Sequence, residues 1–127
     1  METMQTTDTD TYAVRLSEDW KNYSLGETKV EAVKGVDIAI TRGDFATIAG
    51  PSGSGKSTIL NLIGCIDLPT RGIVEVTGRR TDVLTDRRIT ALRREAIVFI
   101  FQSFNLVPVL NLYENVELPL LLGPKAP

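Results

Sequence analysis

The sequence has no histidine and a single cysteine, Cys65, among its 127 residues. The absence of imidazole side chains excludes every catalytic or metal-binding scheme that would use histidine within this chain. One cysteine excludes an internal disulfide bond. A single cysteine fits a reducing compartment, and its apolar neighbours indicate a small buried side chain.

Long apolar runs and an excess of positive charge are also missing. No run reaches the roughly 18 apolar residues that a membrane helix needs. The polar, acidic start "METMQTTDTDTY" lacks the basic-then-apolar order of a signal peptide. The net charge is −2, so bulk electrostatics do not attract nucleic acid. We therefore expect a cytoplasmic chain with no nucleic-acid partner, whose membrane contacts are made through another protein.

The arginines are the one uneven feature of the charge distribution, because six of them gather between residues 79 and 94. Two interpretations stand. The cluster is either a solvated helix face of mixed charge, which is the commoner case, or a binding patch. The six are Arg79, Arg80, Arg87, Arg88, Arg93 and Arg94.

The order of predicted elements indicates an α/β protein. Residues 1–11 are rich in threonine and aspartate and predict a disordered acidic tail, so that residues 12–127 form the domain. Apolar and polar residues alternate over 36–41, which predicts a half-buried strand, and the apolar runs 45–49 and 96–101 predict two strands buried in a parallel sheet. A short strand over 72–78 and helices over 57–64, 85–95 and 111–122 complete the pattern, with Pro119 expected to end or bend the last helix.

A glycine-rich loop carries the strongest motif. Residues 50–57, "GPSGSGKS", match the phosphate-binding pattern G-x-x-x-x-G-K-[ST], with a predicted strand before it and a predicted helix after it. Glycines let the backbone curl with its N–H groups inward, and the helix that begins near Lys56 adds its positive N-terminal end. Lys56 suits the β- and γ-phosphates, Ser57 suits Mg²⁺, and Thr58 is expected to help order the phosphates. The candidate cofactor-binding residues here are Gly50, Pro51, Ser52, Gly53, Ser54, Gly55, Lys56, Ser57 and Thr58.

Two further side chains are candidates for nucleotide contacts. Gln102 directly follows the predicted strand 96–101, and ligands of open α/β sheets bind at that end of the strands. Its amide oxygen could bind Mg²⁺ or hold a water, or Gln102 is simply a surface-loop residue. Tyr23 could stack on adenine, although a core or surface tyrosine is the simpler interpretation and Trp20 competes for the role.

The stretches "VEAVKGVDIAITRGDFATIAGPSGSGKSTILNLIGCIDLPTRGIVEVTG" and "ALRREAIVFIFQSFNLVPVLNLYENVELPL" resemble the ATP-binding subunit of ABC transporters, in the lipoprotein-release and macrolide-export branch. The resemblance extends from about Tyr12 to Leu122. It implies ATP and Mg²⁺ as ligands, a Walker A loop at residues 50–57, a Q-loop glutamine at Gln102 that touches Mg²⁺ and the attacking water, and an adenine-stacking Tyr23. It also implies a membrane permease and a second ATP-binding subunit as partners, and a place at the inner face of the membrane through that permease.

The fold implied by the resemblance is a P-loop NTPase with an ABC-type ATP-binding core and an N-terminal antiparallel β part, truncated before the helical subdomain is complete. The family also needs an "LSGGQ"-like signature, an acidic strand with a catalytic glutamate, and a switch histidine, and this sequence has none of them. We therefore expect Mg-ATP binding with negligible hydrolysis by the chain alone. Without the acidic strand, we expect an exposed edge at strand 45–49 that favours association. The alternatives are a non-hydrolysing regulatory nucleotide-binding module and a P-loop small-molecule kinase.

Overall fold

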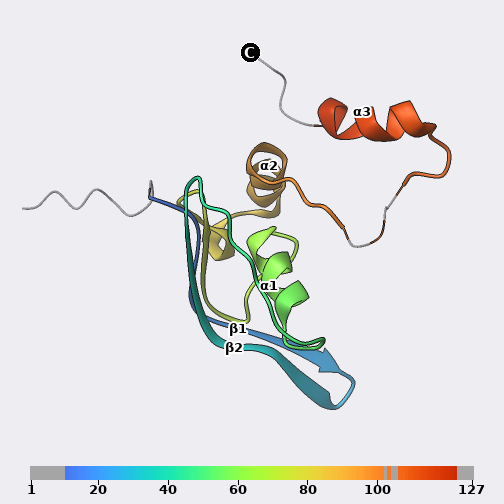
Figure 1. The fold of residues 1–127 in the computed structure, drawn as a ribbon. Coiled ribbons are helices and arrows are strands. Elements are labelled where there is room, and N and C mark those ends of the chain that lie inside the picture. The colour runs from blue at the N-terminus through green and yellow to red at the C-terminus, as the bar shows by residue number, and fades with distance from the viewer. Residues whose placement is uncertain (1–10, 102, 104–105, 123–127) are drawn as a thin grey trace, which may run out of the picture.

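A computed structural model describes residues 11–101, 103 and 106–122 of the chain. Its strands form one antiparallel sheet in the order β2-β1-β3-β4 (Figure 1). The strands are β1 (Tyr12–Leu25), β2 (Thr28–Thr41), β3 (Arg71–Val76) and β4 (Arg79–Arg80). The predicted acidic tail lies almost entirely outside the described residues and stays a prediction.

A long hairpin of β1 and β2 is the largest part of the sheet. The two strands turn at Gly26 and pair along their length, with Tyr23 opposite Val30 and Leu16 opposite Ile38. The alternation over residues 36–41 therefore predicted part of β2 correctly. The sequence did not predict β1 residue by residue, because its polar and apolar residues do not alternate cleanly and the strand is irregular between Leu16 and Lys21.

The helices begin and end where local signals placed them. Helix α1 (Lys56–Ile63) is followed by Gly64, whose N–H donates to the Leu60 carbonyl. After the 3₁₀ helix η2 (Thr81–Val83), helix α2 (Asp86–Ala96) is capped by Thr85, whose hydroxyl accepts from the Arg88 N–H at 3.3 Å.

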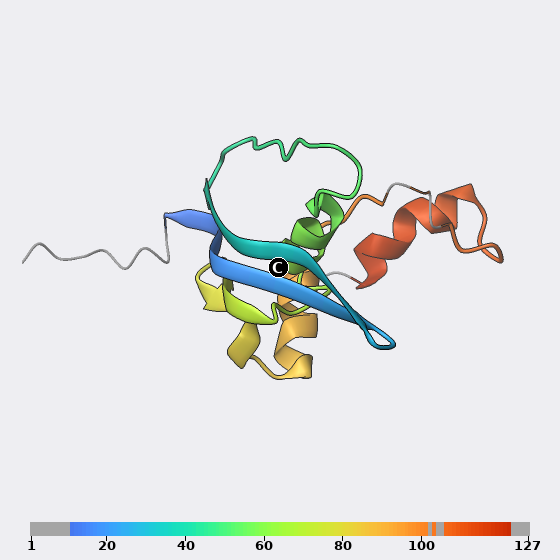
Figure 2. The same cartoon turned by 90° about the horizontal axis from the view of Figure 1, so that it is seen from below.

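Helix α3 (Leu112–Leu122) begins with the predicted capping box. The Glu114 N–H donates to the Asn111 side chain at 2.8 Å, and the Asn111 N–H donates to the Glu114 carboxylate at 3.2 Å. We expected Pro119 to end or bend this helix. It does not end it, because α3 continues to Leu122. None of its residues is buried, and the helix stands apart from the rest of the fold in both ribbon views (Figures 1 and 2).

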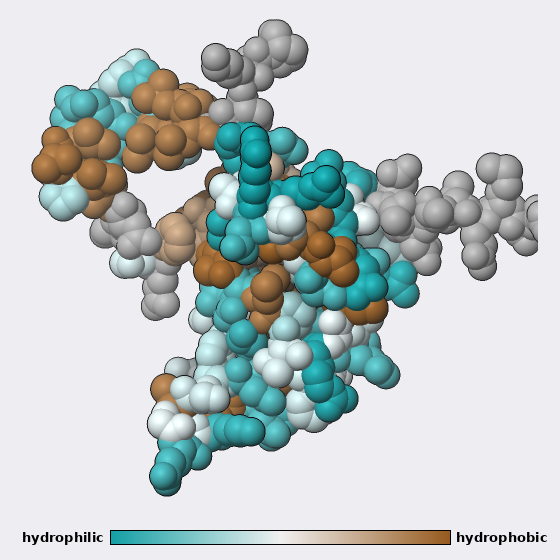
Figure 3. Space-filling model, turned by 180° about the vertical axis from the view of Figure 1, so that it is seen from behind, coloured by the Kyte–Doolittle hydropathy of each residue, from teal (hydrophilic) through white to brown (hydrophobic). Residues whose placement is uncertain are grey.

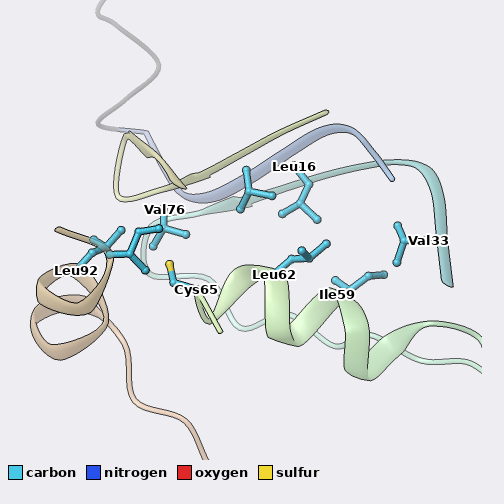
Figure 4. Close-up of a cluster of buried hydrophobic side chains, with 9 residues drawn as sticks. Leu16, Val33, Ile59, Leu62, Cys65, Val76 and Leu92 are labelled. Carbon is cyan, nitrogen blue, oxygen red and sulfur yellow. The ribbon is translucent and has the colours of Figure 1, made fainter. Parts of the chain in front are cut away.

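The core lies between one face of the sheet and helices α1 and α2. Leu16 from the sheet faces Leu62 of α1, and Val76 lies beside Cys65 and Leu92 of α2 at one end of the cluster (Figure 4). Cys65 is buried in the same cluster, as its apolar neighbours indicated. This packing fixes α1 against the hairpin and so fixes the place of the loop at its start.

The two predicted parallel strands are wrong in the described structure. Residues 45–49 and 97–101 have no strand conformation, and residue 96 ends α2. The chain between β2 and α1 runs apart from the sheet (Figure 2). A strand needs a hydrogen-bonded neighbour, and within the described ranges neither segment pairs with one. Apolar side chains therefore face solvent: Phe45 is 97% exposed, and Val98 and Ile100 are each 91% exposed.

Among the described residues, no helix combines the length and apolar character required to cross a bilayer. The longest described helices have 11 residues each.

Candidate phosphate-binding site

The glycine-rich loop is closed by backbone geometry that requires glycine. The Ser54 N–H donates to the Pro51 carbonyl at 3.2 Å, which makes a tight turn. Gly55 has φ +92°, a left-handed conformation that residues with a Cβ rarely adopt. A Cβ on Gly55 would also lie 2.5 Å from the carbonyl oxygen of Ala32, which is on β2. The loop is thus pressed against the hairpin at this residue.

Helix α1 starts at this loop with its N-terminal N–H groups uncapped. Gly55 occupies the capping position, no side chain accepts a hydrogen bond there, and the first turn has no acidic residue. The first N–H groups of any helix lack intrahelical acceptors, and they form the positive end of the helix dipole. An anion such as a phosphate group satisfies both conditions at once.

Lys56 adds a formal positive charge at the same point. Its ammonium donates a hydrogen bond to the carbonyl of Gly50, so the side chain folds back over the loop. Ser57 is exposed and Thr58 is half-buried at the start of α1. A lysine and a hydroxyl beside an uncapped helix end are the donor set that a magnesium-bound polyphosphate needs.

A cavity of about 530 Å³ opens over the loop and is large enough for a nucleotide polyphosphate. Six predicted residues line it, while Gly50, Pro51 and Ser54 belong to the loop without lining the cavity. The lining residues are Ser52, Gly53, Gly55, Lys56, Ser57 and Thr58 from the loop and α1, and Val30, Glu31 and Ala32 from β2.

The wall contributed by β2 was not predicted. Glu31 brings a carboxylate to a site suited to anions, and Lys34 pairs with it at 3.5 Å. No local pattern in "TKVEAV" could have revealed this wall, because the contact joins residues more than twenty positions apart.

Tyr23 lies beside the cavity but does not line it. It is half-buried near the end of β1, and its cross-strand partner Val30 lines the cavity. Its hydroxyl donates to a carboxylate oxygen of Asp67 at 3.2 Å. Trp20, which competed for the adenine role, instead contacts Gly35 and lies 5.2 Å from the guanidinium of Arg71. Stacking of Tyr23 on adenine stays a prediction.

Asp67 carries a shifted pKa. Burial opposes its ionisation, but hydrogen bonds from the Lys21 ammonium and the Leu68 N–H outweigh that effect and lower the pKa of the carboxyl. Asp67 is therefore a carboxylate at neutral pH, so that it pairs with Lys21 at 3.0 Å.

Gln102, the predicted Q-loop residue, lies outside the described residues, and its contact with Mg²⁺ or water stays a prediction. In the arginine cluster, Arg80 pairs with Asp82 at 2.6 Å, and Arg93 donates to the Cys65 carbonyl at 3.2 Å. These two arginines have partners within the chain, and the cluster is divided between β4 and α2.

The comparisons with known proteins agree with this geometry. A family model described as "ABC transporter" matches residues 33–126. An uncharacterized ABC transporter ATP-binding protein of Thermotoga maritima is 48% identical over 108 residues, which cover 85% of this chain and 46% of that protein. The macrolide export ATP-binding/permease protein MacB of Bdellovibrio bacteriovorus is 46% identical over 101 residues, which cover 80% of this chain and 16% of that protein.

One solved structure is similar over most of the chain. The ATP-binding cassette MJ0796 of Methanocaldococcus jannaschii, in a dimeric post-hydrolysis state bound to ADP and Pi, matches with a TM-score of 0.84 and 47% identity. The match covers 90% of this chain and 49% of that one, so the chain spans about half the length of the relatives that consist of an ATP-binding protein alone. The chain therefore belongs to the ABC transporter family, in which it corresponds to the N-terminal portion of the ATP-binding domain, close to MJ0796 and the MacB proteins.

Proposed function

We propose that this chain binds Mg-ATP at residues 50–58 and belongs to the subunit that energises an ABC-type membrane exporter. The observation that carries the proposal is the uncapped start of α1, where Lys56 and Ser57 line one cavity together with Ser52, Gly53 and Gly55 of the loop. Bound Mg²⁺ would neutralise charge on the β- and γ-phosphates. Ser57 would hold the metal, with Gln102 as a second ligand.

The described residues that line the cavity support binding and orientation of the phosphates. The loop N–H groups would hold the phosphates in a fixed position, and the flexible Lys56 side chain would bring a positive charge to them. Water activation next to a γ-phosphate usually needs a carboxylate or a comparable orienting group. Glu31 is the one carboxylate among the residues that line the described cavity, and Lys34 pairs with it. We therefore propose that ATP binds with negligible turnover by this chain alone.

The proposed partners are a membrane permease and a second ATP-binding subunit. MJ0796 forms a dimer, and the name of MacB joins an ATP-binding part to a permease part. By analogy, the chain would act at the cytoplasmic face of a membrane, through the permease and without nucleic acid.

Replacement of Lys56 by alanine tests the nucleotide site. Lys56→Ala should weaken Mg-ATP binding at least tenfold, about 1.4 kcal/mol, because it removes the only side-chain cation among the residues that line the described cavity. Lys29→Ala is the matched control, since Lys29 is exposed on β2 and does not line the cavity. Isothermal titration calorimetry with the 127-residue chain measures both.

Equal ATP affinity in wild type and Lys56→Ala would contradict the proposed site. Steady phosphate release by the chain that Lys56→Ala abolishes would contradict the absence of turnover. Phosphorylation of an added acceptor alcohol would favour the kinase alternative instead.

A further inference from the structure

Asp67 joins the loop after α1 to the end of β1. One of its carboxylate oxygens accepts from the Lys21 ammonium at 3.0 Å and from the Leu68 N–H at 2.9 Å. The other oxygen accepts from the Tyr23 hydroxyl at 3.2 Å. Each carboxylate oxygen of Asp67 thus accepts a hydrogen bond from a residue of β1, forty-four or forty-six positions earlier in the chain.

The loop that carries Asp67 is hydrogen-bonded both to α1 and to β1. The N–H groups of Ile66 and Asp67 donate to the Asn61 carbonyl of α1 at 2.9 and 3.2 Å. The Thr70 N–H donates to the Trp20 carbonyl at 2.8 Å, and the Lys21 ammonium also donates to the Leu68 carbonyl at 2.8 Å. Asp67 is therefore held by the same helix whose first turn forms the phosphate site.

Tyr23 is fixed at two points by this arrangement. Its hydroxyl is bound to Asp67, and the Lys21 ammonium lies 5.2 Å from the centre of its ring. An ammonium at that distance is attracted to the face of an aromatic ring. The hydroxyl contact fixes the far end of the side chain, so both the direction and the plane of the ring are set before any ligand arrives.

We propose that Asp67 is a positioning residue, which holds the Tyr23 ring in the orientation that receives the base of the nucleotide. The inference rests on the proposed function and on the prediction that Tyr23 contacts the base. A side chain that is already ordered loses less rotamer freedom when a ligand binds, so Asp67 favours base binding without touching the nucleotide. Phosphate binding depends on the loop and Lys56 and does not use Tyr23. Asp67 should therefore affect the part of the ATP affinity that comes from the base and not the part that comes from the phosphates.

Binding of ATP and of inorganic tripolyphosphate, each with Mg²⁺, separates this role from a structural one. Asp67→Ala should weaken ATP binding by about three- to tenfold, the range expected when one side chain must be ordered on binding. Tripolyphosphate has no base, so its affinity should not change. Tyr23→Phe should give the same pattern as Asp67→Ala while it leaves the Asp67–Lys21 pair intact. The double variant should be no weaker than either single variant, because both remove one shared contact.

Asp82→Ala is the matched control, since Asp82 also pairs with a cation, Arg80, and does not line the cavity. Unchanged ATP affinity in Asp67→Ala overturns the inference, and so does an equal loss for ATP and tripolyphosphate. If Asp67→Ala does not fold, Tyr23→Phe is the test: a loss for ATP alone supports the inference, and an unchanged ATP affinity or an equal loss for both ligands overturns it. A wild-type chain that binds neither ligand overturns the proposed function and this inference together. If Lys56→Ala weakens binding of both ligands while Asp67→Ala and Tyr23→Phe change neither, the proposed function stands and the role of Asp67 is overturned.

Discussion

Among single residues, Asp19 combines complete burial with an ionisable side chain. It is buried within β1. Burial raises its pKa from 3.8 to about 7 and outweighs a backbone hydrogen bond at Ser17 that lowers the pKa, while the nearby carboxylates of Asp37 and Asp82 raise it further. A carboxyl that stays neutral in the folded state but ionises in the unfolded state makes stability depend on pH.

The sign of that dependence follows from the raised pKa. The folded chain holds the Asp19 proton up to about pH 7, so the contribution of Asp19 to stability is fully present below about pH 4 and is lost as pH rises to about 7. Asp19→Asn should raise the free energy of unfolding by about 1–3 kcal/mol at pH 8, since it removes a buried charge. The gain should be smaller at pH 5. Urea unfolding at both values measures the difference, and an equal gain at both would contradict this account.

The phosphate-site residues were predictable because their signal is local. Glycines, one lysine and one serine at fixed spacing define the loop, and the structure brings Gly55, Lys56 and Ser57 together at one cavity. Glu31 and Asp67 could not be found in this way. Glu31 lines the cavity with residues more than twenty positions later, and Asp67 bonds to a residue forty-four positions earlier.

At the scale of elements, α2 depends on the cap that the sequence indicated. Thr85→Ala removes the acceptor for the Arg88 N–H and should lower the free energy of unfolding by about 1 kcal/mol. The cost reaches the whole domain because Ile89 and Leu92 of α2 are buried in the core. Thr85→Ser is the control, since it keeps the hydroxyl and should restore most of the loss. Thermal or urea unfolding measures both, and equal loss in the two variants would assign the effect to the methyl group instead.

The same scale explains which elements were predicted. Helix ends follow from nearby residues, so Thr85, Asn111 and Gly64 gave the correct limits. Strands depend on distant partners. Residues 45–49 have the composition of a buried strand but no described neighbour to pair with, whereas the irregular β1 forms because β2 and β3 pair with it on both sides.

For the whole molecule, apolar surface is the dominant property. Phe45, Val98 and Ile100 face solvent, and α3 adds exposed leucines, which appear as a brown region on the helix in Figure 3. Exposed apolar patches on a monomeric protein are sites of association. We expected an exposed edge at a strand over residues 45–49; no strand forms there, and Phe45 is exposed in a segment without regular structure.

We expect the isolated chain to associate through these side chains. A triple variant with Phe45→Ser, Val98→Lys and Ile100→Lys should show a lower average mass than wild type in sedimentation velocity, because charge opposes apolar contact. Val83→Lys changes another exposed apolar residue, on η2, and should leave the mass unchanged. A monodisperse wild-type monomer with a sharp, cooperative thermal transition would contradict the prediction.

The contact between Gly55 and Ala32 restricts how this sequence can vary over generations. Any other residue at position 55 meets two obstacles, the left-handed backbone and the Ala32 carbonyl 2.5 Å away. A compensating change at Ala32 relieves neither, since the obstacle there is a backbone oxygen that every residue type carries. A second mutation at Ala32 can therefore not rescue a loss of Gly55. Among lineages that still use this loop, drift should leave position 55 untouched while Ala32 itself varies.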